Sequence, residues 1–260
     1  MRRNRLIYCV MMFFYISSRA TAQDGPLPAE ELIIPKLKIP PGAAISLKIG
    51  TNIYTPIITD NPEEVYSTSP TAELSPGLNA GIGVEVELTN KISLFADFQY
   101  IQSSARYLIR SGDFTDEFIE DFKQISLPFG LLYNLGSGGI KYYPLAGICL
   151  DYLIKSKLDY AYHPYPEESG YTDYGETDIT FDRNRLHLDM QIGFGFQYQV
   201  KRVFLGLEIA YRHGLINYID TDQMQPMQIY YHTSPPFEFQ SPGFRTHGIM
   251  VNLIIKKKGK

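Results

Sequence analysis

Two residues in the second half of the chain have the types and the spacing of an acid–base pair. His187 and Asp189 lie two positions apart in the segment 185–200, which alternates between apolar and polar residues, so both side chains belong to one face of an extended strand. A carboxylate beside an imidazole can orient the ring for proton transfer. The sequence places no serine or cysteine nucleophile beside them. We therefore interpret the pair as part of a polar network inside the fold and expect no catalytic site.

Three other motifs that could carry chemistry also favour a structural interpretation. The acidic residues of 167–182 lack the regular ligand spacing of a calcium loop, and Gly-Ser-Gly-Gly at 136–139 lacks the Lys-Ser/Thr of a phosphate-binding loop. Cys149 is the one cysteine outside the N-terminal apolar run, which excludes an internal disulfide and a cysteine-rich metal site. We therefore expect no metal site and no cofactor.

The N-terminus has the pattern of an export signal. Three arginines among the first five residues precede a short apolar run at 6–17, and Ala-Thr-Ala at 20–22 offers small residues for cleavage before Gln23. Removing the expected signal peptide, 1–22, takes away four arginines and no acidic residue. This leaves 20 basic against 28 acidic residues, a formal charge of −8. Nucleic acid is a poor partner for so acidic a chain.

Eight segments after the signal alternate between apolar and polar residues, as strands between two different environments do. The chain has 20 Tyr, 15 Phe and no Trp, an aromatic content that favours strands. Apart from the N-terminus, no run approaches the roughly 20 apolar residues that a transmembrane helix needs. The eight segments are 44–54, 77–88, 91–107, 123–135, 141–157, 185–200, 202–213 and 244–256.

The connections between these segments are alternately short and long. The second and third, fourth and fifth, and sixth and seventh segments are joined by turns of hairpin size. The other connections are polar segments of about fifteen to thirty residues, at 55–76, 108–122, 158–184 and 214–243. An up-and-down meander then has all its short turns at one end and all its long loops at the other, as in bacterial outer-membrane barrels.

We therefore predict an all-β fold, an eight-stranded antiparallel up-and-down transmembrane β-barrel over 42–256, with short periplasmic turns and long extracellular loops. Localisation in the outer membrane of a Gram-negative cell follows. An even number of strands leaves both ends of the chain in the periplasm. The basic tail 257–260 is expected there, and Lys-Lys-Lys at 256–258 is expected at the periplasmic lipid headgroups. The Pro-rich segment 23–41 is either an extended linker or, through 31–39, a docking peptide for a periplasmic partner.

Three observations favour apolar side chains outside and polar side chains inside. The segments are long enough to cross a membrane, their polar faces are rich in glycine, and tyrosines lie near the ends of the apolar stripes. Glycine has no use on a water-facing surface but leaves room in a narrow barrel. The alternative, a secreted lipocalin-like barrel, has the opposite orientation. The tyrosines are Tyr54, Tyr100, Tyr133, Tyr142, Tyr198 and Tyr211.

This orientation predicts a polar network in the lumen. Charges inside an eight-stranded barrel must be paired or hydrated, so we interpret them as a filled polar core and not as an open or ion-selective channel. Pro128, which removes one ladder hydrogen bond, is interpreted as a β-bulge. The predicted network comprises Lys48, Glu85, Glu87, Asp97, Asp151, His187, Asp189, Glu208 and Arg212. The other polar residues expected to face inward are Asn52, Asn79, Gln99, Gln124, Asn134, Lys141 and Lys155.

The sequence resembles the PorT-like outer-membrane β-barrel family of the Bacteroidetes over roughly 42–256. The resemblance is carried by GLNAGIGVEVEL at 77–88, ISLPFGLLYNLG at 125–136, YYPLAGICLDYLIKSK at 142–157 and the hairpin that starts at GFGFQYQV, 193–200. It implies the barrel fold, and the named member is associated with a protein-secretion and gliding apparatus. Outer-membrane barrels often end on an aromatic residue that the insertion machinery reads, whereas this sequence ends IIKKKGK.

The leading functional hypothesis is a non-enzymatic outer-membrane barrel with a filled polar lumen that acts as a structural or interaction protein through its long surface loops. A component of a secretion or gliding apparatus is the first alternative, and a secreted lipocalin-like ligand carrier is the second. The expected partners are outer-membrane lipid and periplasmic or envelope proteins that bind 23–41 or the surface loops. We expect a monomer.

Overall fold

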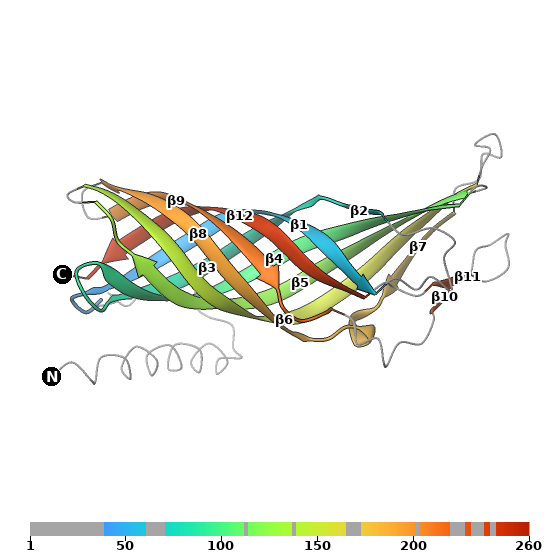
Figure 1. The fold of residues 1–260 in the computed structure, drawn as a ribbon, viewed down its shortest axis with the longest axis horizontal. Coiled ribbons are helices and arrows are strands. Elements are labelled where there is room, and N and C mark those ends of the chain that lie inside the picture. The colour runs from blue at the N-terminus through green and yellow to red at the C-terminus, as the bar shows by residue number, and fades with distance from the viewer. Residues whose placement is uncertain are drawn as a thin grey trace, which may run out of the picture. The chain divides into compact units, whose positions relative to one another are not determined.

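The computed structural model describes residues 39–60, 71–111, 114–136, 139–164, 173–200, 203–218, 227–229, 237–239 and 243–259. The expected signal peptide and nearly all of the Pro-rich segment lie outside the described residues. Eight long strands dominate the rest (Figure 1). They are β1 (Ala43–Asp60), β3 (Ser75–Glu87), β4 (Ile92–Ser111), β5 (Phe114–Tyr133), β6 (Ile140–Pro164), β8 (Leu186–Val200), β9 (Val203–Gly214) and β12 (Gly243–Lys258).

These strands form a closed antiparallel barrel, which confirms the predicted fold class. Each strand pairs with the next along the chain, and β12 pairs with β1 over sixteen pairs of residues, from Ala44 opposite Lys258 to Asp60 opposite Gly243. The start of β1 and the end of β12 therefore lie together, at the end of the barrel that carries the short turns β3–β4, β5–β6 and β8–β9 (Figure 1). This is the periplasmic end. Among the described residues, no helix is long and apolar enough to span a bilayer.

Apolar side chains form a belt on the outside of the barrel, and polar side chains fill its inside. On the paired strands β1 and β12, Ile49 and Leu253 are 59% and 60% exposed, whereas Lys48 and Asn252 are 6% and 2% exposed. This is the orientation of a membrane barrel and is opposite to that of the lipocalin-like alternative. The outcome depends on which alternate residues of each strand face outward, because a shift of one residue in the register exchanges the inward and outward side chains of that strand.

Five of the six tyrosines at the ends of the apolar stripes face outward, as predicted. The assignment of Tyr54 to this group is wrong, because Tyr54 is 4% exposed and points into the lumen. Tyr54 lies an even number of residues from Lys48 and Asn52, so it shares their inward face. The five outward tyrosines are Tyr100, Tyr133, Tyr142, Tyr198 and Tyr211.

Much of the chain predicted as irregular extracellular loop is sheet. β4 and β5 continue through most of 108–122, β6 continues to Pro164, and the short strands β2 (Thr71–Glu73) and β7 (Asp173–Asp178) pair with β4 and β6. The short strands β10 (Met227–Ile229) and β11 (Phe237–Phe239) pair with each other in a separate two-stranded sheet. We call the part beyond the apolar belt the extracellular sheet (Figure 1). It comprises β2, β7 and residues 102–111, 114–123 and 155–164.

Pairs of opposite charge on one face and buried side chains on the other stabilise the extracellular sheet, which explains why its sequence lacks the apolar alternation of the barrel. Arg106 on β4 lies 2.8 Å from Glu117 on β5 and 2.9 Å from Glu73 on β2. On the other face, Ala105 and Phe118 are buried. Cross-strand pairs of opposite charge stabilise neighbouring strands without a hydrophobic stripe.

One β-bulge lies in the β5–β6 ladder, at a place that the sequence did not indicate. The register shifts between Lys123 and Gln124, so Ile154 and Lys155 both face outward. The prediction that Lys155 faces the lumen is therefore wrong. The predicted bulge at Pro128 is also wrong, because Pro128 stays in register with Cys149.

The orientation of the belt predicts a depth-dependent cost for charge on its surface. Leu253→Arg places a charge near the middle of the belt and should destabilise the barrel in lipid bilayers by about 2–4 kcal/mol. Leu88→Arg, at the periplasmic end of the belt, should cost only about 0–1 kcal/mol. Urea unfolding in phospholipid vesicles measures both, and equal effects would contradict the assigned orientation.

Candidate functional site: the polar lumen

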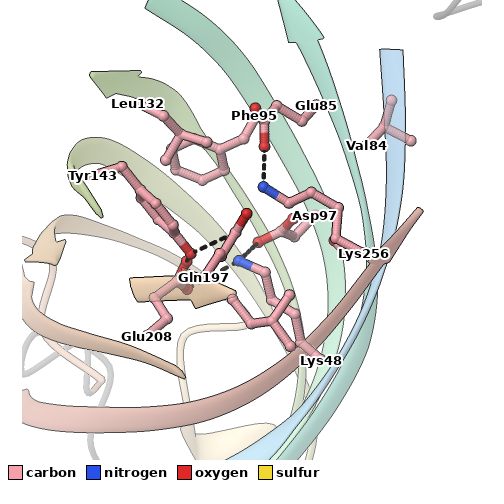
Figure 2. Close-up of a pocket in the computed structure, with 12 residues that line it drawn as sticks. Lys48, Val84, Glu85, Phe95, Asp97, Leu132, Tyr143, Gln197, Glu208 and Lys256 are labelled. Atoms are coloured by element: carbon pink, nitrogen blue, oxygen red, sulfur yellow. Dashed lines mark hydrogen bonds and ion pairs between the residues drawn. The ribbon is translucent and has the colours of Figure 1, made fainter. Parts of the chain in front are cut away.

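A lysine cluster occupies the periplasmic half of the lumen (Figure 2). The Lys48 ammonium lies 2.8 Å from Asp97 and 2.9 Å from Glu208, which come from β4 and β9. All three side chains are at most 7% exposed. The Tyr143 hydroxyl donates to the other oxygen of Glu208 at 3.1 Å and accepts from the Gln197 amide at 3.1 Å. Every charge in this cluster therefore has a direct partner across the barrel.

A second ion pair and an apolar group close the lumen beside the lysine cluster. Lys256 pairs with Glu85, and its ammonium lies 5.4 Å from the centre of the Tyr143 ring. Phe95 and Leu132 pack with Tyr143 in one buried group (Figure 2). The cavity left among these side chains measures only about 20 Å³, which is room for a single water molecule. The lumen at this level is packed and not open.

An arginine cluster occupies the middle of the barrel. The Arg212 Nη2 lies 2.5 Å from Asp151 and 3.1 Å from Asp189, and Nη1 donates to the Tyr54 hydroxyl at 3.4 Å. Arg212 and Asp151 are completely buried. Like the lysine cluster, this one sets one base against two carboxylates. Cys149, beside it, donates from Sγ to the Gln191 side-chain oxygen at 3.2 Å.

Aromatic rings lie over the arginine cluster on its extracellular side. The His187 ring stacks on Tyr218 with 3.8 Å between centroids, and Tyr218 stacks in turn on Phe244 at 5.3 Å. The Tyr218 hydroxyl donates to Gln124 at 3.0 Å. His187 is therefore packed against the Tyr218 ring and is 1% exposed. Since Asp189 binds Arg212, the pair considered for acid–base chemistry is built into the packing of the lumen.

A further buried ion pair, between Arg183 and Glu120, lies at the extracellular mouth of the barrel. Arg183 directs Nε and Nη2 at the two oxygens of Glu120, at 2.6 and 2.9 Å, and both side chains are buried. The Ser156 hydroxyl also donates to Glu120 at 2.6 Å. Arg183 follows the 3-10 turn η2 (Thr180–Asp182), which turns back to the barrel after β7. A bidentate arginine–carboxylate pair of this kind fixes geometry as well as charge.

The structure places eight of the nine predicted network residues inside the barrel and one at its rim. Glu87 is the exception, since it is exposed at the periplasmic rim and pairs with Lys258. The expectation that the whole Lys-Lys-Lys run lies at the lipid headgroups is wrong for Lys256, which is buried in the lumen, and only Lys257 faces outward. The alternation of β12 continues through the run, so alternate lysines have different surroundings.

Several members of the network come from residues that the sequence analysis did not select. Tyr143 and Lys256 follow from the strand alternation, which could have identified them. Arg183 and Tyr218 lie in the segments predicted as irregular surface loops, and nothing in their local pattern shows that these segments return to the barrel mouth. Glu120 was likewise included in a predicted loop, because the extension of β5 was not recognised.

The glycines of the polar face make room for this network. A Cβ atom on Gly195 would lie 2.0 Å from the Tyr143 ring, and one on Gly83 would lie 2.1 Å from an oxygen of Asp97. Side chains at these positions would displace partners of the lysine cluster. The glycine content that indicated a barrel interior therefore has a direct steric cause.

Comparison with known proteins places this geometry in context. The model of the family described as "Outer membrane protein beta-barrel domain" matches residues 22–220. Among solved structures, OprG from Pseudomonas aeruginosa is 10% identical, with a TM-score of 0.45, over 85% of this chain and 99% of its own. Neisserial surface protein A is 11% identical, with a TM-score of 0.40, over 83% of this chain and 98% of its own. No curated protein matches the sequence.

Removing the central base should destabilise the barrel strongly. Arg212→Met leaves Asp151 and Asp189 buried without a counter-charge, which should cost about 3–5 kcal/mol of unfolding free energy. Adding Asp151→Asn and Asp189→Asn should recover most of this loss. Urea unfolding in vesicles, followed by the gel mobility of unheated samples, measures each variant.

Arg106 provides a matched control, since it also binds two carboxylates but is 41% exposed. Arg106→Met should cost at most about 1 kcal/mol, because water screens an exposed pair. A cost for Arg212→Met no greater than that for Arg106→Met would contradict the role of the arginine cluster.

Proposed function

Because the chain belongs to the family of outer membrane protein β-barrel domains, we propose that it is a non-enzymatic barrel that acts through its extracellular sheet and loops and not through its lumen. The observation that carries this proposal is the packed interior. Two clusters and two further ion pairs, together with the His187–Tyr218–Phe244 stack, occupy successive levels of the barrel. A solute would have to break buried charge pairs in order to pass.

The extracellular sheet supports an interaction role. Its outward face carries charged side chains of both signs, and the ladder pairing β4 with β5 continues to Ser111 opposite Phe114. Such a sheet presents a fixed surface and not a set of independent loops. The β12–β1 ladder leaves no free strand edge within the belt for a second copy, which supports a monomer.

We also propose that the protein is exported with a cleaved signal peptide and that it binds a periplasmic or envelope partner. The basic and apolar pattern of 1–22 supports cleavage before Gln23, which N-terminal sequencing of the protein from membranes tests directly. Because β1 starts at the periplasmic end, we propose that the preceding Pro-rich segment 23–41 binds a periplasmic or envelope protein.

A component of a secretion or gliding apparatus is the second candidate. It is supported by the resemblance of 77–88, 125–136 and 142–157 to the PorT-like family. The two candidates differ in what a gene deletion does. Loss of secreted proteins from the medium, with their accumulation in the periplasm, would favour the secretion role over a surface interaction role.

The packed lumen predicts that the barrel conducts no ions steadily. In planar bilayers bathed in concentrated potassium chloride, the purified protein should give no stable conductance steps, because each level of the lumen is occupied. A general porin measured under the same conditions is the positive control. Stable ohmic steps of porin size would contradict the packed lumen and the proposal that rests on it.

The interaction role predicts contacts at the outer face of the extracellular sheet. A photo-crosslinking amino acid at Ile119, which lies on that face, should give a discrete higher-mass adduct in living cells. The same probe at Lys91, in the periplasmic β3–β4 turn, should not give this adduct. The absence of any adduct at Ile119 would count against the extracellular sheet as the working surface.

A further inference from the structure

Three cations lie directly above the apolar belt on three adjacent strands. On β5, Lys123 is the first outward residue on the extracellular side of the belt. Lys155 has the same place on β6, and Arg185 has it just before β8, where its carbonyl accepts a hydrogen bond from the Leu153 N–H at 2.8 Å. The last apolar residues below them are Ile125, Ile154 and Leu186. Lys123 lies opposite Lys155, and Arg185 lies beside Leu153, so the three cations lie together where the belt meets the extracellular lipid headgroups.

Two of these cations are placed directly against each other. Lys123 and Lys155 are opposite residues of the β5–β6 ladder, and the bulge there is what turns Lys155 outward. Like charges directly opposite on neighbouring strands are destabilising unless an anion lies between them. Lys155 has one carboxylate within reach, Asp178 at 3.7 Å, and both side chains are about half exposed. Within the described part of the chain, Lys123 has no ion pair.

The nearby carboxylates are already engaged elsewhere. Asp178 accepts hydrogen bonds from the Thr180 hydroxyl at 2.5 Å and from the Thr180 N–H at 3.0 Å. These bonds hold the pKa of Asp178 below its ordinary value, so this residue is a fixed anion at the edge of the group. Asp121, two residues beyond Lys123, accepts from the Ser104 hydroxyl at 2.5 Å. Asp178 and Asp121 both keep their negative charge, and these two carboxylates against three cations leave the group with a net positive charge.

An exposed aromatic ring adjoins the same cations. Phe181, in η2, is 90% exposed, and the Arg185 guanidinium lies 5.5 Å from the centre of its ring. Arg185 also donates from Nη1 to the Tyr152 hydroxyl at 3.3 Å, and Tyr152 faces outward at the top of the belt. Aromatic rings beside arginine at this height are typical of side chains that enter a membrane interface.

We propose that Lys123, Lys155 and Arg185 bind the phosphate of an anionic lipid in the outer leaflet, with Phe181 packed beside its acyl chains. A lipid phosphate supplies the anion that the opposed lysines lack, and Arg185 offers the planar donor pair that suits phosphate oxygens. The apolar belt directly below accepts the chains of the same molecule. A free phosphate would use only the cations, so the continuity with the belt favours a lipid. The proposal needs the outer-membrane location but not the proposed interaction role.

The test compares two lipids of equal chain length on the folded protein. In neutral detergent micelles, native mass spectrometry should show tighter binding of phosphatidylglycerol than of phosphatidylcholine. Lys123→Gln with Lys155→Gln should weaken phosphatidylglycerol binding about 25-fold, roughly fivefold for each charge, and should leave phosphatidylcholine binding unchanged. Gel mobility of unheated samples checks that the variant is folded. If the double variant fails to fold, wild-type protein still serves, because added salt should abolish the preference for phosphatidylglycerol.

Lys157 is the matched control, since it lies on the same strand farther from the belt and is neutralised by Asp159 at 3.1 Å and Glu176 at 2.8 Å. Lys157→Gln should keep the full preference for phosphatidylglycerol. Equal binding of both lipids by wild-type protein, or an unchanged preference in the double variant, would overturn the proposal. Displacement of phosphatidylglycerol by an equal concentration of inorganic phosphate would also overturn it, because the site would then take a free anion.

Discussion

The pairing of β12 with β1 is the constraint on which the rest of the molecule depends. In the hydrocarbon region no water is present to satisfy backbone donors and acceptors, so a sheet that crosses it must have no edge. Closure with eight strands fixes the width of the interior, and this width is too small for a channel. The interior must therefore be filled, and the exterior must be apolar. The alternation of the strands follows from these two requirements.

In a filled interior that contains charged residues, each charged side chain then needs a partner of opposite charge nearby. Among the described residues, the buried set contains four lysines and arginines and six carboxylates. Lys256 and Arg183 each take one carboxylate, whereas Lys48 and Arg212 each take two from different strands. Lys48 on β1 reaches β4 and β9, and Arg212 on β9 reaches β6 and β8. All of these contacts except Arg212–Asp189 join strands that are not neighbours in the barrel. The glycines below Tyr143 and Asp97 are the steric counterpart of the same arrangement.

The sequence predicted the barrel and most of its lumen well, because the alternation of apolar and polar residues along a strand reflects the different surroundings of its two faces. It failed where a residue's place depends on partners far along the chain. Lys155 was assigned inward because the bulge in β6 at Ile154 appears only in the pairing with β5 and cannot be recognised from local alternation. The extensions of β4 and β5 were missed because charge pairs such as Arg106–Glu117 leave no apolar stripe. Arg183 and Tyr218 enter the barrel from segments whose composition is that of ordinary surface loops.

The continuation of β4 beyond the apolar belt extends the sheet away from the bilayer. Ten residues, 102–111, extend the strand by roughly 33 Å at about 3.3 Å per residue. Because β4, β5 and β6 carry the same ladders up from the bilayer, the extracellular sheet is a continuation of the barrel wall. The distance of its outer residues from the apolar belt is therefore set by strand length.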